Sequence, residues 1–435
     1  MLFKERKDFY GGKHIISHME LYNFFSGANG QSASIIAKKE FSDFPPTFDN
    51  IWILGKEYHA LHDLEDLRTV VRSKIWFSYR SGFPPIGGTG PKTDKYWGCM
   101  LRCGQMVMAE ALICRHLGRG WTWNPIDPVY MDILKMFQDK KDSPYSIHQI
   151  AQMGVSEGKA IGQWFGPNTV AQVLRKLSVY DKWSSLAVHV AANSTVIQSD
   201  IRTLCHYQPS SPTPSPYLKS YNTIWYTDCV DQSCPRWQAA SLTNTDSVSW
   251  RPMLLFIPLR LGLSTFNPIY SKCIKNTFTM KQSLGILGGR PRHAVWFIGY
   301  TGNELICLDP HVTQPTVDLE DKFDDSSYHL PLGGSKRMHI SDIDPSVALC
   351  FYFDTEEDFD DWCQEVNKLI VPEKQPLFEL IDDRPRHWPP LELRPDLNCS
   401  NCSLEYYFVE QESNADISDE DFESVESMVC LPKNK

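Results

Sequence analysis

One stretch decides how this chain folds, Tyr96-Trp97-Gly98-Cys99-Met100-Leu101-Arg102-Cys103-Gly104-Gln105, which follows the glycine-rich run Gly87-Gly88-Thr89-Gly90-Pro91. From Cys99 onward, apolar residues recur at steps of three and four, which predicts a helix that ends near Gly118. Cys99 then lies at a helix N-terminus, where free N–H groups and the helix dipole favour a negative charge. Such a cysteine has a lowered pKa and is a nucleophile near neutral pH. Taken alone, Cys99 is also compatible with a buried cysteine that only begins a helix.

A second polar cluster lies far downstream, in Leu308-Asp309-Pro310-His311. In extended backbone, residues two apart point to the same side, so the Asp309 carboxylate and the His311 imidazole are expected to lie together. A carboxylate beside an imidazole stabilises the charged ring and orients it, which is the task of the third member of a catalytic triad. Alone, the motif also fits a turn at a strand end. A nucleophilic cysteine upstream favours the catalytic interpretation, because Cys–His–Asp sites assemble in space.

Composition restricts the classes of protein that fit. The 435 residues carry 43 Lys and Arg against 53 Asp and Glu, a formal net charge of −10, and they contain no basic block. This balance argues against a nucleic-acid partner. The first 30 residues lack an apolar signal region, and no apolar run is long enough to span a membrane. We therefore expect a cytoplasmic protein without a transmembrane segment, whose 13 cysteines are reduced thiols.

The order of predicted elements indicates an α+β fold, with the Cys99 helix packed on a mostly antiparallel sheet. Strands are expected at 51–58, 186–190, 253–263, 294–300, 304–308 and 347–353, and helices at 64–77, 130–137, 169–177 and 358–369. Residues 44–380 form the expected catalytic domain, with a small inserted subdomain near 120–145 and a mobile loop near 206–250. Residues 1–43 are expected to be a flexible lead-in, and residues 381–435 a tail that is first proline-rich and then acidic.

Several blocks of the chain resemble the autophagins, the autophagy-related cysteine proteases. The blocks occur in family order between Phe44 and Phe378: Tyr79-Arg80, 87–91, 97–105, Ser146-Ile147-His148-Gln149, 162–169, Gln282-Ser283-Leu284-Gly285 and 308–311. The resemblance implies a papain-like fold and a catalytic triad of Cys99, His311 and Asp309. It also implies an endopeptidase that cuts a ubiquitin-like autophagy modifier after a glycine near its C-terminus, and that releases the modifier from phosphatidylethanolamine at membranes.

The same resemblance suggests roles for residues around the nucleophile. Tyr79 would help to form the oxyanion hole beside the Cys99 N–H group. Trp164 would cover the groove and, with a loop that maps to Met280, Lys281, Gln282 and Ser283, clamp the glycine tail. Lys281 stands where many family members carry proline, which leaves the stiffness of this loop open. A covered groove selects glycine by steric exclusion alone. Without the resemblance, ordinary loop packing is the favoured interpretation of Trp164, because most large aromatic side chains are buried for packing.

No cofactor and no metal are expected. Cys399 and Cys402 have the spacing of a zinc knuckle, but no matching second pair follows, and Cys229 and Cys234 are too far apart. Cys103 lies one turn after Cys99 and is interpreted as a core cysteine, since the geometry for a disulfide between them is poor. His116 and His148 lack a carboxylate motif and are interpreted as structural.

The acidic tail contains a candidate docking motif, Phe422-Glu423-Ser424-Val425, preceded by acidic residues. Its spacing resembles the short linear motif with which autophagy proteins bind their modifier, and Phe422 and Val425 would fill two apolar pockets. The alternative is an ordinary solvated acidic tail. For the whole chain, the second function class is a catalytically weak adaptor that binds the same modifier, and a transglutaminase-like enzyme is a third.

Overall fold

A mixed sheet forms the centre of the protein in this computed structural model, which describes residue 44 and residues 47–206, 250–320, 323–331 and 333–393. Its main path runs in the order β11-β9-β8-β7-β12-β6-β4, and β1 joins β8 with β2 as its hairpin partner. The strands are β1 (Asn50–Ile53), β2 (Lys56–His59), β4 (Ala187–Val190), β6 (Met253–Arg260), β7 (Ser283–Arg290), β8 (His293–Thr301), β9 (Glu304–Leu308), β11 (Lys336–His339) and β12 (Ser346–Phe353).

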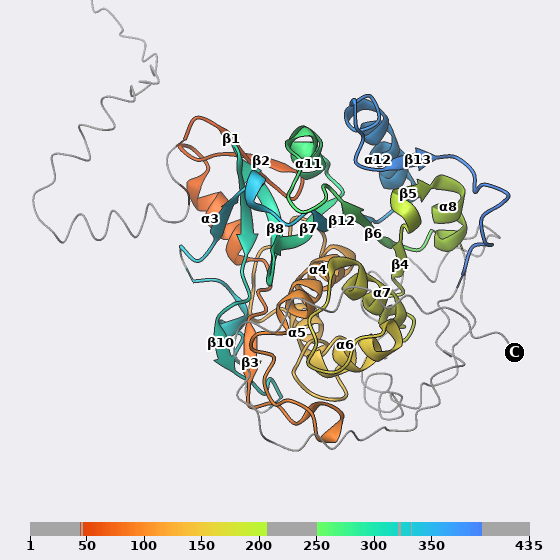
Figure 1. Ribbon diagram of the computed structural model, residues 1–435. Coiled ribbons are helices and arrows are strands. Elements are labelled where there is room, and N and C mark those ends of the chain that lie inside the picture. Colours follow the sequence, from red (N-terminus) through yellow and green to blue (C-terminus); the bar gives the residue numbers. More distant parts are fainter. Residues whose placement is uncertain (1–43, 45–46, 207–249, 321–322, 332, 394–435) are drawn as a thin grey trace, which may run out of the picture. The chain divides into compact units, whose positions relative to one another are not determined.

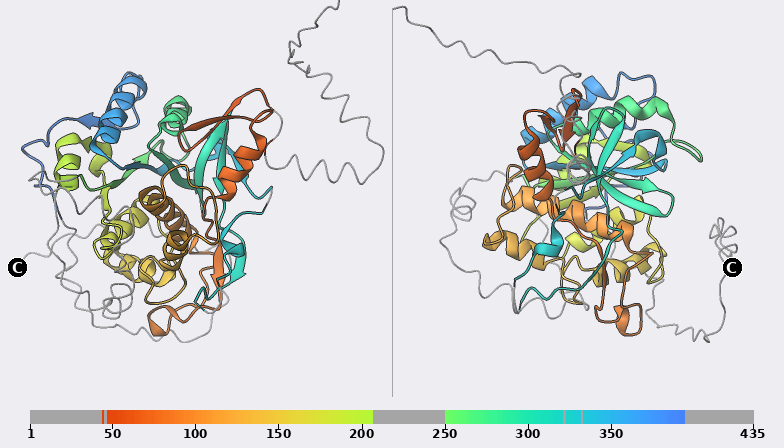
Figure 2. Two further views of the ribbon diagram at one scale, coloured as in Figure 1. Left: turned by 180° about the vertical axis from the view of Figure 1, so that it is seen from behind. Right: turned by 90° about the vertical axis from the view of Figure 1, so that its left-hand side faces the viewer.

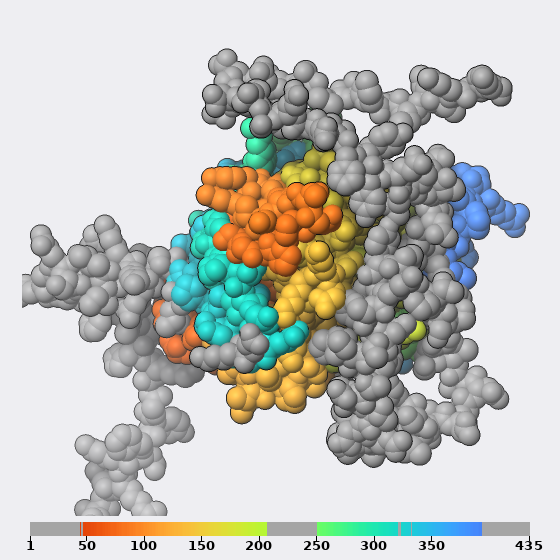
Figure 3. Space-filling view, turned by 90° about the horizontal axis from the view of Figure 1, so that it is seen from below, coloured from red at the N-terminus to blue at the C-terminus, as the bar shows by residue number. Residues whose placement is uncertain are grey.

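Antiparallel pairing dominates this sheet. In the part of the chain that the structure describes, β4 and β6 are its one parallel pair. Two short parallel pairs lie outside it, β3 (Tyr79–Ser81) with β10 (Thr313–Pro315), and β5 (Thr195–Ile197) with β13 (Glu379–Ile381). β3 and β10 lie side by side in Figure 1, and orange and teal parts of the chain also adjoin in the view from below in Figure 3.

Helices cover both faces of the sheet (Figures 1 and 2). The described helices are α3 (Leu64–Arg72), α4 (Cys99–His116), α5 (Pro128–Lys135), α6 (Ile147–Met153), α7 (Pro167–Ser178), α8 (Gln198–His206), α11 (Ser271–Thr279) and α12 (Glu356–Leu369). Alternation along β6 explains the two layers: Leu254 and Phe256 belong to the core shared with α4 and α7, while Leu255 and Ile257 face the core of α8, α11 and α12. The expected α+β fold, with the Cys99 helix on a mostly antiparallel sheet, is confirmed.

Helix α4 is buried along nearly its whole length, from Cys99 to Cys114. It can approach α7 closely because Gly104 has no side chain. A Cβ atom there would lie 2.5 Å from the Val170 methyl group, inside the distance of any real contact. The helix therefore lies in the middle of a core, and its N-terminal residue is held in one position.

Some expected elements differ in detail. Residues 51–58 form the β1–β2 hairpin, because Leu54 and Gly55 both have positive φ and make a tight turn. The helix expected to reach residue 77 ends at Arg72. Strand β7 was not expected. The 120–145 segment, expected as a small inserted subdomain, contributes α5 and shares the core of α4 through Phe137 and other side chains.

Three expectations fall outside the described residues: the lead-in 1–43, most of the 206–250 loop, and the tail motif with Phe422 and Val425. Among the described residues, no helix is long and apolar enough to cross a membrane. All eight cysteines in these residues are free thiols, and all eight are buried.

Candidate active site

Cys99 is the first residue of α4, and Gly98 precedes it as the N-cap. The position of Cys99 at the start of the helix depends on Asp94, whose side chain occupies the space beside Gly98. A Cβ atom on Gly98 would lie 2.4 Å from the Asp94 carboxylate. Asp94 is fully buried and accepts hydrogen bonds from the Arg80 N–H group at 2.6 Å and from the Arg102 guanidinium at 2.8 and 3.0 Å. The turn before Cys99 is thus tied to α4 by a buried ion pair.

Asp309 and His311 come from the segment that follows β9. The His311 Nδ1 atom lies 2.6 Å from an Asp309 carboxylate oxygen, and the same oxygen accepts the His311 backbone N–H group. Two further bonds fix this segment: Trp76 donates its indole N–H to the Asp309 carbonyl, and Tyr79 donates its N–H to the Pro310 carbonyl. The carboxylate and the ring therefore have a defined mutual orientation, as their spacing predicts.

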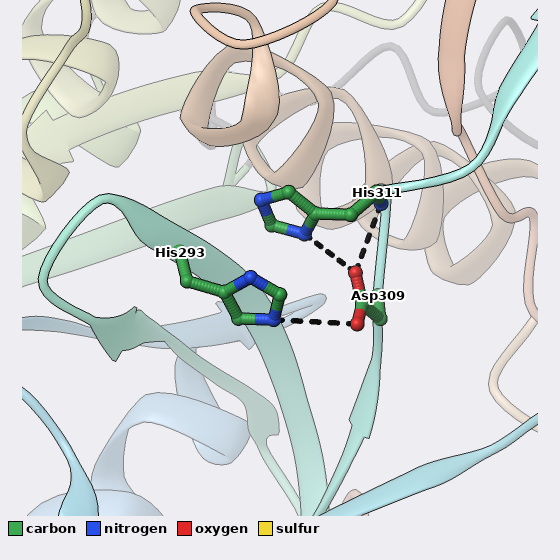
Figure 4. Close-up of side chains that lie close together, drawn as sticks. All are labelled: His293, Asp309 and His311. Atoms are coloured by element: carbon green, nitrogen blue, oxygen red, sulfur yellow. Dashed lines mark hydrogen bonds and ion pairs between the residues drawn. The ribbon is translucent and has the colours of Figure 1, made fainter. Parts of the chain in front are cut away.

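His293 contacts the other carboxylate oxygen of Asp309, as Figure 4 shows, and Lys336 contacts the same oxygen. The His293 Nε2 atom lies 3.3 Å from this oxygen and the Lys336 Nζ atom 2.7 Å. His293 is the first residue of β8, directly after the turn from β7, and its ring stacks on that of His311 with centroids 3.8 Å apart. The Asp309 carboxylate thus contacts three side-chain nitrogens, and its bond to His311 Nδ1 orients that ring.

The electrostatics favour a thiolate next to an imidazolium. Burial alone would raise the pKa of Cys99, but the nearby His311 ring, the Ala294 backbone and the Trp164 indole outweigh it, and the pKa is lowered. Burial likewise opposes charge on His311, yet the hydrogen bond to Asp309 and the proximity of Cys99 raise its pKa to about 9. The pKa of Asp309 is held far below its usual range, because its hydrogen bonds overcome burial. The arrangement thus suits a Cys–His–Asp nucleophile.

Tyr79 and Trp164 both lie at the thiol. The Trp164 indole N–H points at the Cys99 sulfur, 3.2 Å away, while 39% of this side chain is exposed and Cys99 is fully buried. Trp164 therefore lies between the thiol and solvent. Burial and the neighbouring Cys99 raise the pKa of Tyr79, so its hydroxyl stays protonated and can donate a hydrogen bond. Its ring meets His311 edge-on at 5.3 Å.

The loop 280–283 is not at this site, so its expected role in the groove is corrected. The Ser283 carbonyl accepts a hydrogen bond from Arg119, which lies beyond the C-terminal end of α4, whereas Cys99 begins that helix about 26 Å away along its axis. Ser283 also begins β7, and the turn that reaches Asp309 follows the other end of that strand, about 23 Å further on. The segment at Cys99 is instead the start of β8, directly after the β7–β8 turn, with His293 and Ala294.

Residues 280–282 lie against α11 and α12, and other residues surround Asp309 and Cys99. Lys281 and Gln282 instead contact α12 through Asp361, at 3.3 and 2.8 Å. Met280 is buried in the core of α11 and α12. The site residues not anticipated are His293, Lys336 and Asp94. No local motif marks His293 or Lys336, because strand pairing alone brings them to Asp309. Asp94 carries one signal: it lies four residues before Gly98, which must be glycine to make room for it.

The remaining titratable candidates lie apart from the nucleophile or are inactive. Cys103 is completely buried, and burial together with the nearby Cys99 raises its pKa well above the usual value. His148 is buried beside Phe83, and burial lowers its pKa to about 4. His116 stacks on Trp183 at 3.9 Å, near the far end of α4. These environments agree with packing roles.

A metal ion does not suit the polar cluster at the site. Donor atoms of His293, Asp309 and His311 lie within 4.8 Å of one another. However, the two imidazole planes are nearly parallel, at 10°, and are stacked face to face. The lone pairs of ring nitrogens lie in the ring planes, so two stacked rings do not direct them at one point. Lys336 adds a positive charge at the same carboxylate. The cluster is a hydrogen-bonded network rather than a ligand set.

Comparison with known proteins agrees with this chemistry. Residues 64–365 match the peptidase C54 catalytic domain. The chain belongs to the peptidase C54 family. It is 48% identical to the cysteine protease ATG4B of Xenopus laevis over 389 residues, which are 88% of this chain and 94% of that protein. It is 47% identical to ATG4A of Homo sapiens over 353 residues, covering 80% and 86%. The resemblance to the autophagins is confirmed, and so are a papain-like cysteine protease fold and a thiol protease of autophagy.

Proposed function

We propose that this peptidase C54 member cleaves a ubiquitin-like autophagy modifier after a glycine near its C-terminus, with Cys99 as nucleophile. The single observation that carries the proposal is the covered thiol: Cys99 has a lowered pKa, lies under Trp164, and shares a site with His311 and Asp309. Where the Trp164 indole covers the approach to the thiol, a tail of glycine residues passes more easily than a tail with larger side chains.

The proposed reaction begins when the Cys99 thiolate attacks the glycine carbonyl carbon. A C–S bond forms, and the carbonyl electrons move to the oxygen. The Cys99 N–H group and the protonated Tyr79 hydroxyl would stabilise this oxyanion. When the intermediate collapses, the C–N bond breaks and the leaving amine takes a proton from His311 Nε2.

Hydrolysis then completes the turnover. Neutral His311 takes a proton from water, and the hydroxide attacks the thioester carbon. The C–S bond breaks, which returns the thiolate and leaves the modifier with a free glycine carboxylate. Asp309 positions the ring through both steps, since its hydrogen bond fixes His311 Nδ1.

The same site is proposed to release the modifier from phosphatidylethanolamine. That conjugate joins the glycine to the lipid amine through an amide, so the acyl group is identical and the leaving amine alone differs. The enzyme would act at the membrane surface as a peripheral protein, and we place it in the cytoplasm, where free thiols persist.

A mass measurement tests the proposal. The full chain is incubated with a C-terminally extended modifier and, separately, with the lipid conjugate in vesicles. We expect a product that ends at the glycine in both reactions. A matched substrate with valine in place of that glycine should stay intact. Cleavage at another bond, or equal cleavage of the valine substrate, would refute the assignment.

A further inference from the structure

Tyr96 has an unusual backbone conformation for a bulky residue. Its φ is +76°, and it is the one aromatic residue among the described non-glycine residues with positive φ. It occupies the third position of a turn that the Trp97 N–H group closes onto the Asp94 carbonyl at 3.2 Å. Glycine or asparagine is the ordinary choice at such a position, because a Cβ atom is strained there.

The turn cannot relax around Tyr96. Asp94 anchors its first residue through buried bonds to Arg80 and Arg102, and the Gly98 N–H group donates to the Asp94 carbonyl at 2.8 Å. A strained residue persists where its surroundings fix the backbone, and such residues concentrate at functional sites. Fixed turn geometry explains how the strain is tolerated, but it gives no reason for a tyrosine.

Packing gives no reason either, because 81% of Tyr96 is exposed. Its ring contacts its own neighbour Lys95, whose Nζ atom lies 4.7 Å from the ring centroid. Three large exposed apolar residues are next to triad residues, in sequence or in contact, and we call them the site rim: Tyr96, Trp164 and Val312. Tyr96 lies three residues before Cys99, Trp164 contacts the thiol, and Val312 follows His311 with 47% of its surface exposed. Large exposed apolar side chains gathered at one place mark an interaction surface.

We infer that the site rim, with Tyr96 as its principal residue, docks the folded body of the modifier whose tail enters the site. The inference rests on the proposed function. A tail that reaches the buried Cys99 brings the body of its own protein over the rim, so the occupant is a globular domain with an apolar patch beside its C-terminal tail. An aromatic ring fixed on a rigid turn loses little conformational freedom on binding.

Replacing Tyr96 separates docking from a structural role, because the two predict opposite effects. Tyr96→Gly relieves strain, so the melting temperature should rise by about 1–3 °C. The KM for the folded, C-terminally extended modifier should nevertheless rise about five- to thirtyfold, as for loss of an interface anchor. Hydrolysis of a short glycine-ended peptide, which is too short to extend to Tyr96, should change less than twofold.

Matched variants complete the test. Tyr96→Asn, which tolerates the same φ, should weaken modifier cleavage as Tyr96→Gly does, and Tyr96→Phe should retain it. Leu263→Ala, at a residue 91% exposed in the segment after β6, should have no effect. An unchanged KM for the modifier in both Tyr96→Gly and Tyr96→Asn would overturn the docking role alone. A parent chain that leaves the modifier uncut would refute the proposed function and the docking role together.

Discussion

The two ends of strand β7 lie in different surroundings, one at the candidate active site and the other away from it. Its C-terminal end turns into β8 and brings His293 onto Asp309 and the Ala294 backbone onto Cys99. Its N-terminal end, at Ser283, bonds to Arg119 and lies beside α12. The two ends are a few residues apart in the sequence and the length of a strand apart in space. Position along one strand thus decides which loop can touch the substrate.

The largest effect is expected at the nucleophile itself. Cys99→Ala and His311→Ala should each lower kcat/KM for the extended modifier by at least about 10⁴-fold, because each removes a group that reacts directly. The matched control is Cys103→Ala, one helical turn further into the core, which should retain activity within threefold. Iodoacetamide should modify Cys99 before any other thiol. Activity of Cys99→Ala within tenfold of the parent would refute the site.

Asp309→Asn should lower the rate by about 10²- to 10⁴-fold and narrow the pH profile. Asp309 and Cys99 together raise the pKa of His311 to about 9, so the loss of the Asp309 charge lowers that pKa and moves the alkaline limb to lower pH. A less charged His311 stabilises the thiolate less, so the acid limb moves to higher pH. The check is kcat/KM from pH 5 to pH 10 on a short peptide. If both limbs of the pH profile stay at the parent's pH values in Asp309→Asn, the proposed role of Asp309 in orienting His311 is contradicted.

Trp164→Ala should raise KM about tenfold or relax the demand for glycine, because the indole no longer closes the passage above Cys99. The measurement compares glycine and alanine substrates at the cleaved position. Trp183→Ala is the control, since this ring stacks on His116 away from the thiol. If glycine selectivity survives in Trp164→Ala, the tryptophan is a packing residue.

The smallest effect separates the two ends of β7. His293→Ala should lower kcat/KM about three- to tenfold, because the half-exposed ring supports a charged carboxylate. Lys281→Ala, at the other end, removes exposed ion pairs to Asp358 and Asp361 and should change activity less than twofold. Both variants are assayed on the same peptide. A larger loss of kcat/KM in Lys281→Ala than in His293→Ala would restore the role of residues 280–283 in clamping the glycine tail.

Most of the fold follows from local patterns. The three- and four-residue repeat after Cys99 predicts α4, and the alternation around Thr301-Gly302-Asn303 predicts the β8–β9 hairpin. Strand β7 escapes this reasoning because its glycines look like loop residues. In the structure they are strand residues that allow close pairing: a Cβ atom on Gly285 would lie 2.1 Å from the Phe297 carbonyl oxygen. Because the sequence does not predict β7, it does not show that residues 280–283 and the nucleophile lie at opposite ends of this strand.

The candidate site divides in the same way. Cys99, Asp309 and His311 could be predicted because each is marked by its immediate neighbours. The supporting residues could not, since their roles depend on distant pairing. His293 reaches Asp309 only because β8 lies between β7 and β9, and Lys336 only because β11 pairs with β9. Local sequence patterns identify the groups proposed to react, and long-range topology identifies the groups that hold them.

One measurement tests the central claim most directly. The modifier is prepared with an electrophile in place of the bond after its C-terminal glycine, incubated with the full chain, and the adduct is digested and mapped by mass spectrometry. We predict one adduct per chain, on Cys99, which is lost in Cys99→Ala and His311→Ala and retained in Cys103→Ala. An adduct on another cysteine, or no adduct with the parent chain, would contradict the account.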